Sequence, residues 1–309
     1  MADNEKIVSK QYPKLFHYTN VSAFENIYKT QQFWPTHYQD LNDTTEFARF
    51  RLKVREFIRP QIREIIDDSL VEKEAERLLD KIHSHTFSKY MYKDTFLSSF
   101  CAHKKPYEAT HGLLSQWRGY GAKGGVAIML DTLVIEESLK RDYGIFAYQI
   151  MYMADVIYDD RDNDVKIKED FKAVFEYFPE IIKILSEQSN QTKLEPYFEK
   201  MHDDFVLGST LVKHQAFHEE NEVRIVVSPT TKDSHNSNDA NKLLKEICYR
   251  QKDGREARYI KLFGGAPLPI ERIIVGPSRI QNVNYQRISA IVDKNPCIEV
   301  VKSEIPFSS

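Results

Sequence analysis

The stretch SQWRGYGAKGGVAIML, residues 115–130, is the part of the sequence on which the predicted fold depends. It joins an aromatic and arginine cluster to a glycine-rich turn and then to an apolar run with strand character. Glycines let a backbone approach a flat ligand closely, and aromatic faces can stack on a planar ring. Two interpretations stay open: a pocket wall for a planar ring, or a hairpin or loop in which Trp117 and Tyr120 are core anchors.

The composition indicates a globular protein with no strong global charge. The chain has 309 residues, of which 41% are hydrophobic and 29% charged, so it is long enough to bury a full core. Its net charge of -3 gives no overall attraction to nucleic acid or anionic lipid, although a local basic groove is compatible with it.

The cysteines and the apolar runs exclude several classes of protein. Cys101, Cys248 and Cys297 are far apart and have no CxxC spacing, so we expect neither a metal site nor a disulfide framework. No N-terminal apolar leader is visible, and no run approaches the roughly 18 apolar residues of a membrane span. We therefore expect a cytoplasmic protein with no membrane partner.

Short strands and helices alternate along the N-terminal part of the chain. Residues 15–19 (LFHYT) have strand composition and carry His17, and a helix with 3.6-residue periodicity follows. The sequence of residues 33–38 (FWPTHY) predicts a second strand. Asn42, Asp43 and Glu46 come next and could bind a ligand, although capping a helix is their commoner role.

Two long helical regions, at about residues 46–92 and 164–212, interrupt the strands. We expect Pro60 to divide helices in the first region, and Pro179 and Pro196 in the second. The first region is rich in basic residues, which either form solvated helix faces or contact phosphates of an acceptor. These residues are Arg49, Arg51, Lys53, Arg55 and Arg59.

The C-terminal part is again rich in strands. Strands are predicted at residues 95–103, 222–227, 255–263, 270–277 and 297–305, and a short helix at 242–249. No strict βαβ rhythm is present, so the fold class is α+β rather than doubly wound. We expect a single domain over residues 1–309, with the helical regions as insertions.

Two glutamates lie at the start of the strand predicted at residues 222–227. In a strand, Glu220 and Glu222 would project to the same face and could reach one ligand. Two carboxylates so close would raise the pKa of one of them, which suits acid or base chemistry. A solvated edge-strand face is the other interpretation.

Four motifs together resemble a large bacterial domain family of unknown function, which is similar in motif order to the ADP-ribosyltransferase superfamily. They are HYT (residues 17–19), LND (41–43) with Glu46, SQWRGYG (115–121) and FxxExExR (217–224). SQWRGYG and FxxExExR are specific, and the match spans about residues 14–280. The resemblance implies an ADP-ribosyltransferase-like split core of mixed or antiparallel strands.

The resemblance also implies roles for individual residues. Glu222 matches the catalytic glutamate and Glu220 the acid that orients the acceptor, and the order of these two roles stays open. His17 matches the histidine that holds the ribose and nicotinamide end of NAD, and Tyr120 the aromatic that stacks on nicotinamide. The residues implied to bind NAD are His17, Tyr18, Thr19, Trp117, Arg118, Tyr120 and Gly121. No metal is implied.

The expected function is transfer of ADP-ribose from NAD to a macromolecule, either a nucleic acid such as RNA or a protein. Such a protein would be an intracellular toxin or anti-phage effector, with an antitoxin or immunity partner. A non-catalytic nucleotide- or nucleic-acid-binding module and an NAD glycohydrolase are the alternatives. We expect His17, Tyr120 and Glu222 to converge on one pocket, and Glu222→Gln to abolish transfer while sparing the fold.

Overall fold

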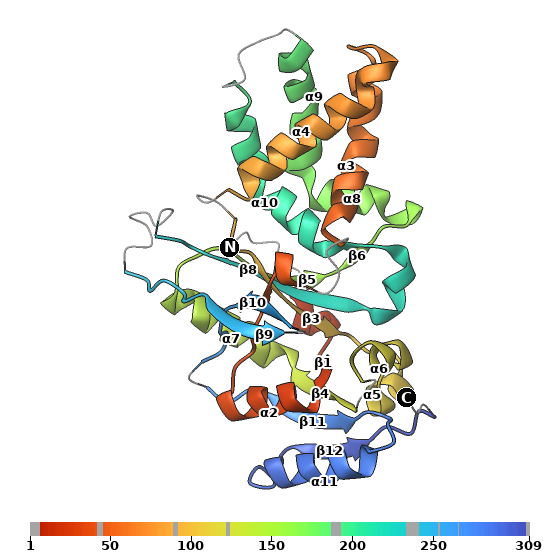
Figure 1. The fold of residues 1–309 in the computed structure, drawn as a ribbon, viewed down its shortest axis with the longest axis vertical. Coiled ribbons are helices and arrows are strands. Elements are labelled where there is room, and N and C mark those ends of the chain that lie inside the picture. Colours follow the sequence, from red (N-terminus) through yellow and green to blue (C-terminus); the bar gives the residue numbers. More distant parts are fainter. Residues whose placement is uncertain are drawn as a thin grey trace.

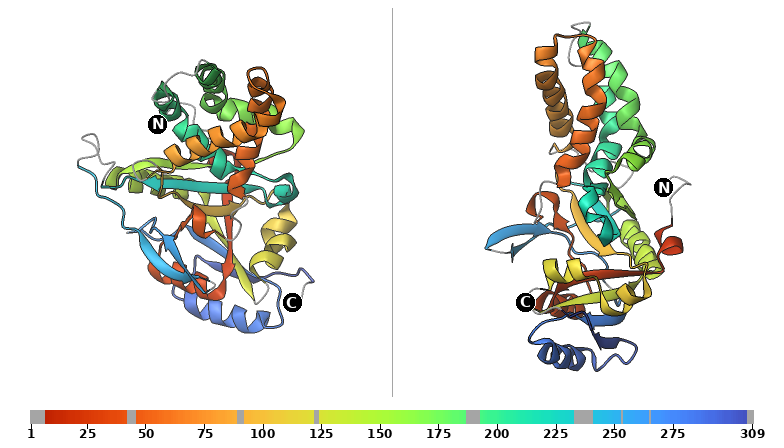
Figure 2. Two further views of the ribbon diagram at one scale, coloured as in Figure 1. Left: turned by 45° about the horizontal axis from the view of Figure 1, so that its top comes forward. Right: turned by 90° about the vertical axis from the view of Figure 1, so that its right-hand side faces the viewer.

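The computed structural model describes residues 7–41, 46–88, 92–121, 124–186, 193–232, 241–252, 254–264 and 266–306. A lobe of helices extends from one side of a β-rich part, which gives the molecule an elongated shape (Figures 1 and 2). Asn42, Asp43 and the side chain of Glu46 lie outside what is described, and so do the roles expected of them.

Most of the described strands form one mixed sheet of ten strands, while β6 and β7 pair with each other. The strands are β1 (Lys14–Asn20), β2 (Thr36–His37), β3 (Phe96–Cys101), β4 (Gly125–Asp131), β5 (Tyr148–Asp155), β6 (Ile157–Tyr158), β7 (Val212–Lys213), β8 (Glu222–Pro229), β9 (Cys248–Lys252), β10 (Arg255–Tyr259), β11 (Ile270–Val275) and β12 (Glu299–Lys302). The α+β class and the mixed sheet are therefore confirmed.

The sheet consists of groups of strands that meet at one narrow point. In the first group, β4 lies between β1 and β11, and β12 runs parallel to β11. In the second, β8 lies antiparallel between β3 and β5. The strands β1 and β3 pair at one position only, Phe16 with Cys101. The two strands diverge beyond this pair, and a cavity lies between them.

Strand β8 is buried along its whole length and joins two cores. Its residues alternate between opposite faces of the sheet, as in any strand. Val223, Ile225 and Val227 pack in the core of the β-rich part, whereas Val226 packs in the core of the helical lobe. The lobe therefore rests directly on the strand that carries Glu222.

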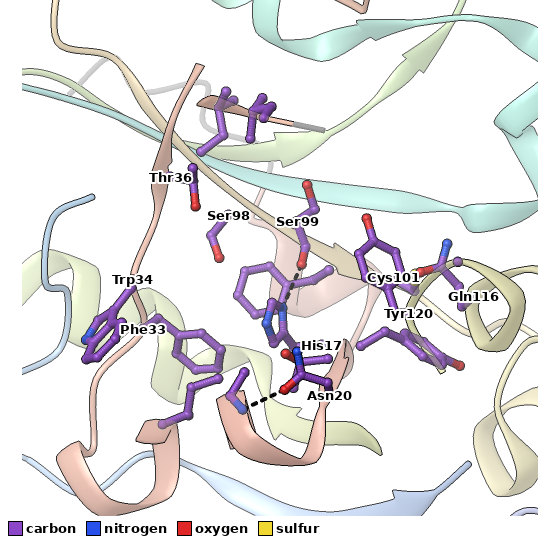
Figure 3. A pocket seen from close by; sticks show the side chains of 18 of the residues that line it. His17, Asn20, Phe33, Trp34, Thr36, Ser98, Ser99, Cys101, Gln116 and Tyr120 are labelled. Carbon is purple, nitrogen blue, oxygen red and sulfur yellow. Dashed lines mark hydrogen bonds between the residues drawn. The ribbon is translucent and has the colours of Figure 1, made fainter. Parts of the chain in front are cut away.

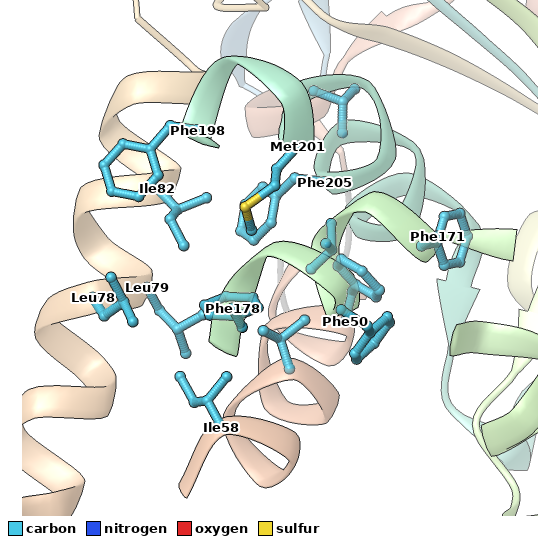
Figure 4. Packing of buried hydrophobic residues seen from close by; sticks show 14 of the residues in the cluster. Phe50, Ile58, Leu78, Leu79, Ile82, Phe171, Phe178, Phe198, Met201 and Phe205 are labelled. Atoms are coloured by element: carbon cyan, nitrogen blue, oxygen red, sulfur yellow. The ribbon is translucent and has the colours of Figure 1, made fainter. Parts of the chain in front are cut away.

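The helical lobe contains the two long helical regions that the sequence predicted. Its helices are α3 (Glu46–Arg63), α4 (Val71–Thr86), α8 (Asp164–Asp170), α9 (Lys172–Ser186) and α10 (Glu195–Leu211). On α3 the residues Phe50, Val54, Ile58 and Ile62 recur every fourth position and are fully buried, so they form one apolar stripe. Side chains of α4, α9 and α10 pack against it (Figure 4).

The basic residues that the sequence singled out in the first helical region are paired with carboxylates of the same chain. Each of the five that we singled out lies in an ion pair with a carboxylate of the same chain, for example Arg51 with Glu76 and Lys53 with Asp164. The expected contacts of these side chains with acceptor phosphates are therefore not favoured by the structure, because their charges are already matched.

Several local predictions are wrong. Pro60 and Pro179 lie inside α3 and α9 and divide nothing. By contrast, the break expected at Pro196 is confirmed, because this proline stands in the first turn of α10, where its missing N–H is tolerated. Residues 242–249 are not helical, because long-range contacts hold this segment extended: Leu243 bridges to Phe146, and β9 begins at Cys248.

The remaining helices surround the sheet. They are α1 (Val8–Gln11), α2 (Val21–Thr30), α5 (Pro106–His111), α6 (Leu114–Tyr120), α7 (Thr132–Ile145) and α11 (Gln281–Val292). Helix α11, which the sequence did not predict, connects the parallel strands β11 and β12 and buries Ile288 and Val292 beside them (Figure 1). None of the helices in the described part of the chain is long and apolar enough to cross a membrane.

Candidate functional site

A cavity of about 710 Å³ opens between β1 and β3, at the point where these strands diverge (Figure 3). Its walls come from β1, the first turns of α2, residues 33–36, β3, α6, the β7–β8 region and β9. These segments are far apart in the sequence, so the cavity exists only in the folded protein.

His17, Tyr120 and Glu222 all line this cavity, as the sequence predicted, although more than 100 residues separate each from the next. His17 points into the cavity from β1, and Tyr120 stands at the end of α6 (Figure 3). Glu222 is the first residue of β8 and pairs across the sheet with Cys101 of β3. Three distant motifs therefore meet at one place.

The imidazole of His17 is held in one orientation. Its Nδ1 donates a hydrogen bond to the carbonyl oxygen of Ser99 at 3.0 Å, and its ring lies edge-on to that of Phe33. Burial lowers the pKa of His17, and the positive charge of Arg250 lowers it further. The ring is therefore neutral at pH 7, and its Nε2 is an acceptor for a ligand hydrogen.

Tyr120 contributes an aromatic face and a hydroxyl. Its side chain is 50% exposed, which is unusual for a large aromatic residue beside buried strands. Partial desolvation and the nearby carboxylates of Glu222 and Glu220 raise its pKa to about 12. The hydroxyl therefore keeps its proton at physiological pH.

Glu222 is buried, with 4% of its side chain exposed, and lies in a network of ion pairs. Its Oε1 accepts from Nε of Arg224 at 2.6 Å, and its Oε2 accepts from Nη2 of Arg224 at 3.0 Å and from Nζ of Lys213 at 2.9 Å. Nη1 of Arg224 donates to the carbonyl oxygen of Thr210 at 2.6 Å, which fixes the guanidinium.

The two glutamates meet, but not by strand alternation. Glu220 ends a 3-10 helical turn, and Asn221 has a φ of 42°, in the left-handed region, so the strand begins only at Glu222. The carboxylates converge because both contact Nζ of Lys213, at 2.7 Å for Glu220 and 2.9 Å for Glu222.

The expected rise in the pKa of one glutamate is wrong for Glu222. Burial alone would raise its pKa, but Arg224 and Lys213 outweigh this effect and hold the pKa at about 2. Glu222 is therefore ionised at any physiological pH.

Not every residue implied to bind NAD lines the cavity. Trp117, Arg118 and Gly121 are absent from its walls. The indole of Trp117 is fully buried, and its Nε1 donates to the carbonyl oxygen of His111 at 3.0 Å. A Cβ added to Gly276 would lie 2.7 Å from the indole, so this glycine makes room for it.

Neighbouring motif residues on α6 differ in burial. The expected turn begins only at Gly121, since residues 114–120 are helical. Trp117 and Tyr120 are three residues apart and share a helix face, but Trp117 is fully buried, whereas Tyr120 is the last residue of the helix and is half exposed. The core-anchor interpretation therefore holds for Trp117 and the pocket-wall interpretation for Tyr120. Arg118 is exposed on the same helix, outside the cavity.

Tyr18 and Thr19 line the cavity together with His17. The ring of Tyr18 is buried, and its hydroxyl accepts from the backbone N–H of Leu113 at 2.7 Å and lies 2.8 Å from Nε2 of His103. Tyr18 therefore joins β1 to the segment before α6 and supports the wall on which His17 and Tyr120 stand.

The cavity wall carries more positive than negative charge. The described lining contains four cations and two carboxylates, although the chain as a whole is acidic. The cations are Lys213, Arg224, Arg250 and Lys252, and the carboxylates are those of Glu220 and Glu222. Of these cations only Arg224 stood in a motif, so the basic wall could not be assigned from the sequence. Within the described residues, no cluster of His, Cys, Asp or Glu is arranged to hold a metal ion.

Comparison with known proteins finds a family model that matches part of the chain. The model of a protein family of unknown function, DUF2971, matches residues 116–225, which run from α6 to β8. No curated protein and no solved structure matches the chain. The expected likeness to a family of unknown function is thus confirmed for this region, and the likeness to ADP-ribosyltransferases stays a prediction.

Proposed function

We propose that this protein is an NAD-dependent ADP-ribosyltransferase that modifies a macromolecule. The observation that carries the proposal is the meeting of His17, Tyr120 and Glu222 in one cavity. The volume of about 710 Å³ is in the range of cavities that enclose a small-molecule ligand. The excess of cations on its wall suits a ligand with a negatively charged diphosphate.

The chemistry follows from the charge that the reaction develops. When the bond between nicotinamide and the ribose C1′ breaks, its electron pair leaves with nicotinamide and positive charge develops on the ribose. A fixed carboxylate near the ribose stabilises this transition state more than the ground state. Glu222 is ionised and held by Arg224 and Lys213, so it can act without reorganisation.

The other residues position the reactants. Tyr120 offers its ring to nicotinamide, and the neutral His17 offers Nε2 to a ribose hydroxyl. Glu220 is less buried than Glu222 and accepts the proton that the acceptor loses when its oxygen or nitrogen attacks C1′. The acceptor is a nucleic acid or a protein, and in a toxin or anti-phage effector an antitoxin or immunity partner would control the site.

A second candidate, a non-catalytic nucleotide-binding module, is favoured by one observation. Lys213 and Arg224, the two cations that hold Glu222, also offset its negative charge. The carboxylate then stabilises positive charge on the ribose less strongly. In such a module the cavity would bind a nucleotide and leave it unchanged.

The test is incubation of the protein with NAD labelled in its adenylate phosphate and with a cell lysate, followed by separation of RNA, DNA, protein and free ADP-ribose. Label in a macromolecule supports the proposal and identifies the acceptor. Label in free ADP-ribose alone indicates a glycohydrolase, and binding of NAD without turnover indicates a binding module.

Two variants sharpen this test. Glu222→Asp keeps the charge beside Arg224 and Lys213 but withdraws the carboxylate by one methylene, so transfer should fall while the fold is kept. Glu219→Gln removes the charge of an exposed neighbour and is the matched control. Equal transfer by wild type and Glu222→Asp would remove Glu222 from the chemistry.

A further inference from the structure

Arg250, on β9, is a partly buried cation without an acidic partner among the described residues. Its Nη2 donates to Oγ1 of Thr36 at 2.8 Å, and its Nε is buried with no hydrogen-bond partner in the part of the chain that the structure describes. Burial lowers its pKa, and no carboxylate opposes this effect. By contrast, Arg258 on the adjacent strand β10 pairs with Asp40 at 2.9 Å.

A charge in this position is unfavourable for the empty protein. Desolvation of a cation is usually repaid by an ion pair, and the described part of the chain supplies none for Arg250. Arg250 nevertheless lines the cavity, and so does Lys252, which projects from the same face of β9. A negatively charged ligand in the cavity would supply the missing partner of Arg250, which explains why a desolvated cation stands there.

Aromatic rings hold the guanidinium in place. Its central carbon lies 5.9 Å from the ring centre of Trp34 and 5.5 Å from that of Tyr259, and these two rings stack with centres 4.8 Å apart. The indole Nε1 of Trp34 is also buried without a hydrogen-bond partner among the described residues. Two buried donors, Nε of Arg250 and Nε1 of Trp34, therefore lack a partner among the described residues at this end of the cavity.

The position of this cluster sets the length of its ligand. Trp34 and Tyr120 lie on opposite sides of the cavity, with His17 between them (Figure 3). A ligand that places one planar ring at Tyr120 therefore needs a long body to reach Arg250. A dinucleotide has that form, because two nucleosides are joined through a diphosphate.

We infer that Arg250 and Trp34 form a phosphate-binding subsite that takes the adenosine diphosphate half of the ligand. The inference rests on the proposed function for the identity of the whole ligand, NAD, but the subsite itself is defined by its own donors. The guanidinium fork would bind phosphate oxygens in two hydrogen bonds, which an ammonium group cannot reproduce.

The experiment is calorimetric titration of ADP, and separately of adenosine, into the wild type, Arg250→Gln, Arg250→Lys and Arg255→Gln. Arg255 begins β10 in the same hairpin, is exposed and does not line the cavity, so its variant is the matched control. Loss of hydrogen bonds to a charged group should weaken ADP binding about 10- to 100-fold in Arg250→Gln. Arg250→Lys should lie in between, and Arg255→Gln should match the wild type.

Adenosine and thermal unfolding separate a ligand role from a structural one. Adenosine has no phosphate, so Arg250→Gln should leave its affinity unchanged. Since the charge has no acidic partner, its removal should keep or raise the melting temperature of the ligand-free protein. Equal affinity of wild type and Arg250→Gln for ADP, or no binding of ADP to the wild type, would overturn the inference.

The outcomes also separate this inference from the proposed function. If ADP binding depends on Arg250 but NAD is never consumed, the subsite stands and the transferase proposal fails. If NAD is consumed and Arg250→Gln changes neither its KM nor the affinity for ADP, the subsite fails alone.

Discussion

Replacement of Glu222 by Gln tests the ion-pair network most sharply, because it removes a charge and little volume. The sequence led us to expect that this change spares the fold. The structure corrects that expectation: the side chain is 4% exposed, and its oxygens accept from Arg224 and Lys213, which are themselves buried. The variant leaves both cations with less opposing charge.

The pKa of Glu222 sets the size of the effect. Its fall from 4.5 to about 2 on folding corresponds to about 3 kcal/mol of preference for the ionised form, at 1.36 kcal/mol per pKa unit. Gln resembles the neutral form, so we expect Glu222→Gln to lower the free energy of unfolding at pH 7 by about 3 kcal/mol.

The pH dependence has a definite sign. The folded pKa lies below the unfolded one, so the stabilisation is fully present above about pH 4.5 and is lost as the pH falls towards 2. The difference in stability between wild type and variant should therefore be constant from pH 7 down to about pH 5 and should shrink at lower pH.

Urea denaturation, followed by circular dichroism, measures this difference. The control is Glu219→Gln, which removes an exposed charge three residues away and should change the stability by less than about 0.5 kcal/mol. If Glu222→Gln were as stable as this control at pH 7, the buried ion pairs would not exist as described. Transfer assays of Glu222→Gln must accordingly be made where circular dichroism shows it folded.

Three further predictions concern other parts of the molecule. Trp117→Ala should lower the unfolding free energy by about 3–5 kcal/mol in urea denaturation, because the indole is fully buried, and a loss below about 1 kcal/mol would contradict its place in the core. Gly208→Ala should lower the stability by about 1–3 kcal/mol, since its Cβ would lie 2.5 Å from the ring of Phe50; an unchanged melting temperature would show that α3 and α10 pack less closely. NAD affinity should be constant from about pH 8 to 7, because burial lowers the pKa of His17 and keeps its ring neutral there, and a calorimetric change within this range would contradict the lowered pKa.

The parts of the fold that depend on local pattern could be predicted from the sequence. The strand at residues 15–19 and the strand at 222–227 correspond to β1 and β8, because β-favouring runs form both. Their motifs lie at or beside strands, and this is why His17 and Glu222 could be expected in one pocket. The helical pattern of residues 46–92 likewise corresponds to α3 and α4.

The features that depend on long-range contacts could not be predicted. The pKa of Glu222 is lowered first by Arg224 of the same motif and then by Lys213, which reaches it from β7 and belongs to no motif. Arg250 meets Thr36 across more than 200 residues, so no local pattern places it in the cavity. Trp117 and Tyr120 looked equivalent because the burial of Trp117 depends on packing against residues distant in the sequence, such as Gly276.

The wrong predictions at Pro60 and at residues 242–249 also result from long-range contacts. Pro60 lies near the end of α3, where the helix continues for only three more residues and tertiary packing of the apolar stripe outweighs one lost hydrogen bond. The extended form of residues 242–249 depends on Phe146 and on the ion pair of Lys245 with Asp142 at 2.9 Å, and neither partner is near in sequence.

The central claim is that the cavity between β1 and β3 binds NAD along its length. A crystal structure of the protein with a hydrolysis-resistant NAD analogue tests it most directly. We predict the nicotinamide ring against Tyr120, its ribose beside His17 and Glu222, and the diphosphate on Arg250. An analogue bound outside this cavity, or a cavity that stays empty at saturating analogue, would contradict the account.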